Sequence, residues 1–88
     1  MSDHSPRPAA DVVARRLGDS AVLVRLSTNR IYELNDTGAR LWELLEQGAS
    51  IDTAVATLVT EFAAPHDDIA RDVDALIRDL TEHGLIVS

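Results

Sequence analysis

The feature that most constrains the fold is a change in the spacing of apolar residues partway along the chain. Before Asn35, short runs rich in valine, leucine and isoleucine alternate with the turn-forming pairs Gly18-Asp19 and Thr28-Asn29. After Asn35, apolar residues recur every three or four positions. Short runs bounded by turn residues are typical of strands, and a three-to-four spacing is typical of one face of a helix. The sequence therefore predicts strands first and helices second.

Three short strands are expected, from Val12 to Leu17, from Ala21 to Leu26 and from Ile31 to Leu34. The connections between them are only a few residues long, and consecutive strands joined in this way usually pair with each other. An antiparallel meander of three strands follows.

Three helices are expected after the strands. Asn35, with the polar residues that follow it, and Ser50 are suitable N-caps for the first and second helix, while Pro65 separates the second from the third. Gly48 and Gly84 are suitable stops for the first and third. The apolar positions at helical spacing are Leu41, Leu44 and Leu45 in the first helix, Ile51, Val55, Leu58 and Phe62 in the second, and Ile69, Val73, Leu76, Ile77 and Leu80 in the third.

Neither the strands nor the helices can bury their apolar faces alone, so the sequence predicts a single α+β domain over residues 11–88. Its order is an N-terminal three-stranded antiparallel sheet followed by three helices, similar to a winged helix-turn-helix. Residues 1–10 contain two prolines and no apolar period, which predicts a disordered tail. Leu85 to Val87 are too few to form a separate element and are expected to pack on the core or bridge to the sheet.

Composition excludes several classes of function. The formal charge is −7, from 15 acidic residues against 8 arginines, and this opposes binding to nucleic acid. No apolar run approaches the roughly 20 residues of a membrane span, and no signal peptide is visible, so a cytoplasmic protein without membrane contact is expected. The 88 residues leave little room for both a core and an enclosed active site.

The polar residues favour no catalytic or metal site. The acidic group Asp67, Asp68, Asp72 and Asp74 is explained by acids in the first turn of a helix and a solvated face beyond it. The serines occupy turn or cap positions, without a neighbouring histidine and aspartate arrangement that would activate them. A non-catalytic protein without cofactor or metal is therefore predicted.

One segment resembles a known family. The run Ile31 to Gly38, followed by Leu41 to Leu45 and Gly48, is similar to the PqqD-like family of peptide-recognition domains, and the resemblance extends over about Val12 to Val87. It implies that the chain binds the leader segment of a ribosomally synthesised precursor peptide. It also implies that the chain delivers this leader to a separate maturation enzyme.

The second strand departs from the pattern of the members that act in pyrroloquinoline quinone synthesis. These members have a Leu-Leu-Ala-Pro-Glu-like stretch where this chain has Leu23 to Ser27. The shorter strand from Asp19 to Leu23 and the Thr37-Gly38 pair resemble more closely the stand-alone leader-binding proteins of lasso-peptide pathways. That resemblance implies a cysteine peptidase as partner, with a radical-SAM enzyme as the alternative.

The third strand of a meander lies at an edge, where its outer backbone groups have no partner, so it can accept one more strand. The resemblance places the leader between this strand and the third helix. The leader-binding residues implied are Arg30, Ile31, Tyr32, Glu33 and Leu34 on the strand, and Asp72, Val73, Leu76 and Asp79 on the helix.

Some of these positions have a second explanation. Arg30 and Glu33 can equally be charges that protect an edge strand from unwanted pairing, and the same edge leaves dimerisation open. Tyr32 is balanced between the core and the groove, whereas Trp42, beside a leucine stripe, is expected in the core.

Two other functions compete with leader binding. A winged helix that reads DNA would insert its third helix into the major groove. Between Asp67 and His83, however, six acids against two arginines give a net charge of −4, which phosphates would repel. A module that binds another folded protein, without a peptide ligand, is separated from leader binding only by the family resemblance.

Overall fold

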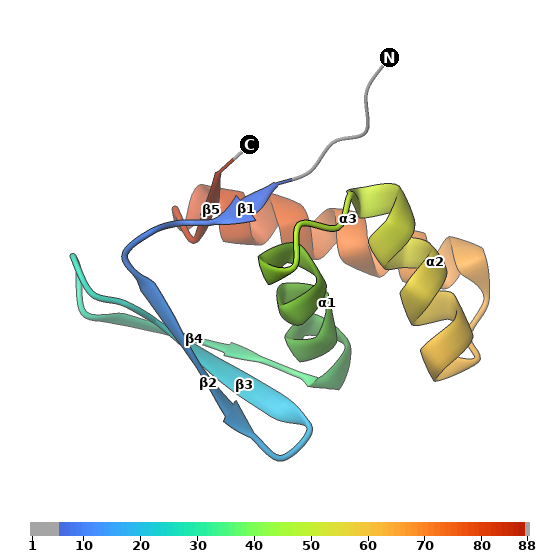
Figure 1. Cartoon of the computed structure of the whole chain (residues 1–88), viewed down its shortest axis with the longest axis horizontal. Helices are drawn as coiled ribbons and strands as arrows, with labels where there is room; N and C mark the ends of the chain where they lie inside the picture. Colours follow the sequence, from blue (N-terminus) through green and yellow to red (C-terminus); the bar gives the residue numbers. More distant parts are fainter. Residues whose placement is uncertain (1–5, 88) are drawn as a thin grey trace.

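A computed structural model describes residues 6–87 (Figure 1). It has a three-stranded sheet and three helices; the first helix packs on one face of the sheet, and the second packs on the other two helices, away from the sheet. The elements in chain order are β1 (Arg7–Pro8), β2 (Val12–Leu17), β3 (Ser20–Arg25), β4 (Arg30–Leu34), α1 (Asp36–Glu46), α2 (Ile51–Phe62), α3 (His66–Glu82) and β5 (Ile86–Val87). The predicted α+β class is confirmed, with the sheet before the helices.

The main sheet is an antiparallel meander with the order β2-β3-β4. Gly18, with φ at +64°, forms the turn between β2 and β3, and Asn29, with φ at +56°, lies in the turn between β3 and β4. Glycine and asparagine tolerate this left-handed conformation better than other residues, so the sequence determines where the chain reverses. The expected second strand is shifted by one residue, because Leu26 lies in the turn.

The helices begin at the predicted caps. The Asn35 side chain accepts a hydrogen bond from the Gly38 backbone N–H at 2.9 Å, and the Ser50 hydroxyl accepts one from the Thr53 N–H at 3.1 Å. Such bonds satisfy backbone donors that the first turn of a helix leaves unpaired. Asn35 follows β4 directly, so its cap fixes the angle at which α1 leaves the sheet.

The core lies between the inner face of the sheet and the three helices. Leu23 in the central strand, Leu41 in α1 and Leu58 in α2 are completely buried. Trp42 is 2 % exposed and donates its indole N–H to Glu46 Oε2 at 3.0 Å, so the prediction that it belongs to the core is confirmed. Every described helix contributes buried residues at the spacing that the sequence predicted.

The prediction of a disordered tail that ends at Ala10 is wrong for its second half. Arg7 and Pro8 form β1, which pairs antiparallel with β5, and the Ala9 N–H donates to the Leu85 carbonyl at 2.9 Å. Proline suggested a loose segment because it cannot donate to a strand ladder, but at the edge of a two-residue pair this loss costs little. Residues 1–5 lie outside the described part of the chain.

The sequence predicted that the C-terminal residues either pack on the core or bridge to the sheet, and the structure shows the first of these. Leu85 and Ile86 are each 3 % exposed, so they pack on the core. Ile86 and Val87 form β5, which pairs with β1 and not with the main sheet. Among residues 6–87, no helix is long and apolar enough to cross a membrane.

Replacement of Leu58 with alanine should lower the free energy of unfolding by about 2–5 kcal/mol, because it opens a cavity in a fully buried site. The matched variant Leu26→Ala, at a side chain that is 57 % exposed, should change it by less than about 0.5 kcal/mol. Urea denaturation followed by circular dichroism measures both values. Equal losses in the two variants would contradict the packing described here.

Candidate functional site

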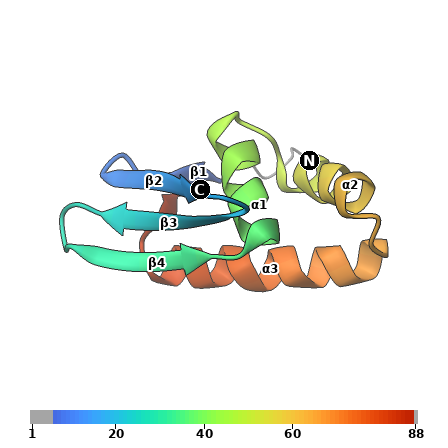
Figure 2. The same ribbon diagram turned by 90° about the horizontal axis from the view of Figure 1, so that it is seen from below.

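β4 is the outer strand of the sheet, and α3 passes behind this strand in the view of Figure 2. Within residues 6–87, β4 pairs with β3 alone, and none of its backbone groups bonds to α3. The predicted position of the third strand at an edge of the sheet is therefore confirmed. An edge of this kind offers a row of unpaired N–H and C=O groups to another extended chain.

The five predicted residues of β4 divide between the two faces of the sheet. Arg30, Tyr32 and Leu34 share the inner face, since Tyr32 pairs with the buried Leu23 and Leu34 is itself buried. Ile31 is 68 % exposed, and it shares the outer face with Glu33. Side chains alternate along a strand, so the sequence predicted the strand correctly but did not separate these two sets.

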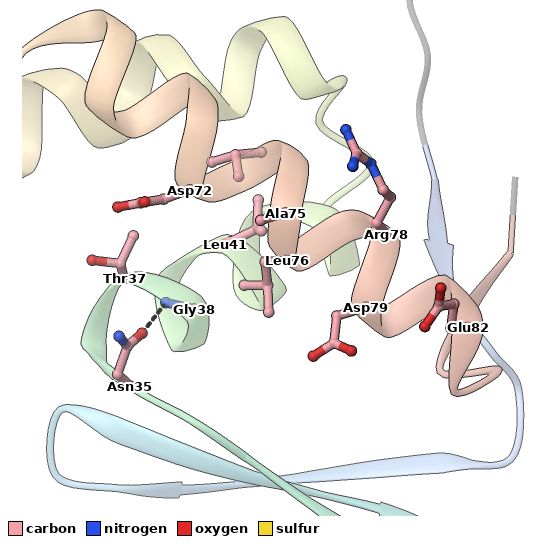
Figure 3. Close-up of a pocket in the computed structure, with 11 residues that line it drawn as sticks. Asn35, Thr37, Gly38, Leu41, Asp72, Ala75, Leu76, Arg78, Asp79 and Glu82 are labelled. Carbon is pink, nitrogen blue, oxygen red and sulfur yellow. Dashed lines mark hydrogen bonds between the residues drawn. The ribbon is translucent and has the colours of Figure 1, made fainter.

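A cavity of about 660 Å³ opens between the start of α1 and the length of α3 (Figure 3). Four other cavities in the described part of the chain have volumes of about 290–410 Å³. Its walls are Asn35, Thr37, Gly38 and Leu41 from α1 and its N-cap, and Asp72, Val73, Ala75, Leu76, Arg78, Asp79 and Glu82 from α3.

All four helix residues predicted for the site line this cavity. Val73 is 2 % exposed and forms part of the floor, while Leu76 is half-buried. Asp72 is exposed and Asp79 partly exposed. The expected apolar floor with a carboxylate rim is therefore present, although only a small part of Val73 is accessible.

The contribution of α1 was missed. Gly38 lies in the first turn of α1, and a Cβ atom there would stand 3.2 Å from Leu76 Cδ2 and 3.3 Å from Leu34 Cβ. A side chain at position 38 would therefore crowd the contact between α1, α3 and the end of β4. The available signal was the glycine itself, because glycine inside a helix costs up to 1 kcal/mol relative to alanine and usually has a packing reason.

Tyr32 and Asp79, predicted separately, are joined directly. The Tyr32 hydroxyl donates to Asp79 Oδ2, and the tyrosine ring meets the His83 ring edge-on at a centroid distance of 5.2 Å. Burial, followed by the hydrogen bond to the Asp79 carboxylate, raises the pKa of Tyr32 to about 12. The pair connects the inner face of β4 to α3, so Tyr32 is part of the packing between these two elements.

A second cavity of about 300 Å³ continues along β4 towards its N-terminal end. Its lining includes Arg25, Arg30, Tyr32 and His83, and it shares Glu82 with the larger cavity. The Arg25 guanidinium donates to the His83 carbonyl at 3.1 Å and faces Asp11 at 3.4 Å. This contact could not be predicted from the sequence, since the residues are far apart in the chain.

We refer to the two cavities and the β4 edge between them as the groove. The described residues contain no group of three or more histidine, cysteine, aspartate or glutamate side chains placed to hold a metal ion. An open sheet edge beside an apolar floor and a polar rim is the arrangement of a peptide-recognition domain that works by strand addition.

Comparison with known proteins identifies the family. The family model described as coenzyme PQQ synthesis protein D (PqqD) matches residues 20–86, and the chain belongs to this family. The family resemblance inferred from the segment between Ile31 and Gly48 is confirmed. No curated protein matches the chain.

Two solved structures are similar to the chain over nearly its whole length. One is TbiB1 in complex with the TbiA(beta) leader peptide, with a TM-score of 0.85 and 28 % identity over 91 % of this chain and 93 % of that one. The other is a lasso peptide synthetase B1 complexed with the leader peptide, with a TM-score of 0.84 and 25 % identity over 96 % of this chain and 99 % of that one.

The pKa of Tyr32 can be measured directly, because it is the single tyrosine of the chain. In a titration followed by phenolate absorbance, the midpoint should lie near 12 in the folded protein. The raised pKa means that folding favours the neutral phenol. Its contribution to stability should be complete below about pH 10 and should be lost as the pH rises towards 12.

Replacement of Asp79 with asparagine should move this midpoint downwards, since it removes the negative charge that disfavours phenolate while burial remains. The Asp74→Asn variant, on the same helix and outside both cavities, serves as the control and should leave the midpoint unchanged. An identical midpoint in all three proteins would contradict the contact between Tyr32 and Asp79.

Proposed function

We propose that this chain binds the leader segment of a ribosomally synthesised precursor peptide as an additional strand on β4 and presents it to a separate maturation enzyme. The observation that carries the proposal is the unpaired β4 edge beside the 660 Å³ cavity of α1 and α3. Membership of the PqqD family and similarity to two B1 proteins in complex with leader peptides support it.

In this proposal the strand residues bind the guest through their backbone, and the helix residues bind it through their side chains. The backbone of Arg30 to Leu34 would pair with the guest, and each main-chain hydrogen bond would contribute about 0.5–1.5 kcal/mol. Backbone pairing cannot distinguish one sequence from another, so selection would come from side chains that enter the groove against Asp72, Val73, Leu76 and Asp79. Ile31 and Glu33, on the outer face, would contact the guest mainly through their backbone.

In this proposal the protein is not an enzyme and needs no cofactor. Its role is to raise the local concentration of the precursor beside the enzyme that modifies it. Similarity to the lasso peptide B1 proteins favours a cysteine peptidase as that enzyme, with a radical-SAM enzyme as the alternative. The site of action would be the cytoplasm, where the ribosome releases the precursor.

The competing function, DNA binding through α3, is disfavoured by electrostatics. The acids of α3 that line the larger cavity, Asp72, Asp79 and Glu82, lie where a winged helix would meet phosphates. Calorimetric titration with the leader of the precursor encoded beside this gene, and with duplex DNA at physiological salt, tests both functions. Binding to DNA without binding to the leader would favour DNA binding over leader binding as the function.

Strand addition predicts a specific pattern of amide exchange. Saturating leader peptide should slow hydrogen exchange at alternate amides between Arg30 and Leu34, because only every second N–H of a strand points towards the open edge. The amides of β2, at the opposite edge of the sheet, are the internal control and should change little. Unchanged exchange along β4 in the presence of bound leader would contradict strand addition.

Replacement of Leu76 with aspartate should weaken leader binding by more than about 1 kcal/mol, because it places an unpaired charge on the apolar floor. Fluorescence polarisation with a labelled leader measures the affinity, and circular dichroism confirms the fold. The matched variant Leu17→Asp, at a side chain that is 56 % exposed and outside the groove, should bind as the wild type does. An unchanged affinity of Leu76→Asp would contradict the assignment of the floor.

A further inference from the structure

The two ends of the groove differ in charge. The larger cavity, at the end where β4 enters α1, has the carboxylates of Asp72, Asp79 and Glu82. The smaller cavity, at the opposite end of β4, has Arg25, Arg30 and His83, with Glu82 at the boundary between the two. The end at the larger cavity is therefore acidic, and the end at the smaller cavity is basic. Which peptide this groove accepts is a question that rests on the proposed function.

Asp72 is the carboxylate most available to a ligand at the acidic end. Asp79 already accepts the Tyr32 hydroxyl and lies 3.5 Å from His83 Nδ1. Asp72 forms no ion pair with any residue that the structure describes. Arg78, the arginine of this cavity, forms an ion pair with Asp74 and is directed away from Asp79 (Figure 3). The carboxylate of Asp72 is therefore not neutralised by a neighbour.

Arg30 has the corresponding position at the basic end. Arg25 is engaged with Asp11 and with the His83 carbonyl. Arg30 is exposed, lies on the inner face of β4 with Tyr32, and has no ion-pair partner among residues 6–87. An added strand would pass beside this guanidinium, which favours a carboxylate of the guest.

The distances fit the repeat of an extended peptide. Asp72 precedes Leu76 by four residues and His83 by eleven, which correspond to roughly 6 Å and 16 Å along a helix that rises 1.5 Å per residue. Alternate side chains of a strand are separated by roughly 6.8 Å. Leu34 and Leu76 both approach Gly38, and Arg30 lies four residues from Leu34 along β4, which is two alternate steps of a strand. Successive inward side chains of a guest would therefore reach Asp72, then Leu76, then the Tyr32–Asp79 pair, and then Arg30.

The direction of the guest follows from the sheet. β2, β3 and β4 are all antiparallel to their neighbours, and antiparallel pairing is slightly more stable than parallel pairing. β4 runs from Arg30 at the basic end to Leu34 at the acidic end. An antiparallel guest would begin near Asp72 and end near Arg30.

We propose that the groove selects a segment with a cationic and an apolar side chain at successive alternate positions and an anionic side chain two alternate positions further on, in that order from N to C. Asp72 recognises the cation, Leu76 the apolar residue and Arg30 the anion. Asp72 and Arg30 are then determinants of specificity, and the apolar floor supplies most of the affinity.

Two synthetic peptides of identical composition test this proposal. Both have threonine at the intervening positions, and one has lysine, isoleucine and glutamate in the proposed order while the other has glutamate, isoleucine and lysine. Two-dimensional NMR of the labelled protein, at peptide concentrations up to millimolar, measures both affinities. The first peptide should bind about tenfold more tightly at low salt, and the ratio should shrink in high salt because exposed charges are screened.

Charge-reversal variants assign the effect to residues. Asp72→Arg should abolish the preference for the first peptide, whereas Asp67→Arg, with the same change in net charge on the same helix but outside the groove, should keep it. Arg30→Glu should likewise abolish the preference, whereas Arg15→Glu on β2 should keep it. Circular dichroism of the four variants confirms that each is folded.

The outcomes separate this inference from the proposed function. Equal affinity for the two peptides, a preference for the reversed order, or the absence of binding by either peptide would overturn the charge-order proposal. If the leader still protected β4 amides in the exchange experiment, the proposed function would stand without it. If the leader gave no protection and no binding, the proposed function itself would fail.

Discussion

The site depends on one strand, β4, whose backbone is hydrogen-bonded on one side only. β4 forms its ladder with β3, and its other edge faces α3 without a hydrogen bond to it. A sheet edge inside a small domain is normally covered or blunted, because it invites pairing with other chains. Here the edge is instead bordered by a helix that supplies an apolar floor, so the exposed backbone becomes a site with defined walls. The placement of α1 and α3 around this edge determines what the domain can bind.

The order and type of the main elements could be predicted from the sequence because local chemistry and the tertiary structure agree. Gly18 and Asn29 adopt the positive φ values that their turns require, and Asn35 and Ser50 make the cap bonds expected of them. The pairing of β1 with β5 could not be predicted. It joins the two ends of the described chain through a strand of Arg7 and Pro8, and two residues show no periodicity.

The site was predicted in outline from the family resemblance and an argument about sheet edges. The position of β4 at a sheet edge follows from the order of short strands in the sequence, whereas the wall of α3 was implied by the family resemblance alone. The contact between Tyr32 and Asp79 and the approach of Gly38 to Leu76 depend on how distant elements meet. Side-chain spacing places a residue on a face of its own helix or strand, but it does not specify which residue of another element lies opposite.

The β1–β5 pair also has a consequence for engineering. Arg7 lies opposite Val87, so the two ends of the described chain leave the domain side by side (Figure 1). Adjacent ends are compatible with circular permutation, in which a short linker joins the old ends and the chain is opened in an exposed turn such as Gly18-Asp19. A chain rearranged in this way would keep the groove intact, because its new ends lie in the turn between β2 and β3 and outside both cavities.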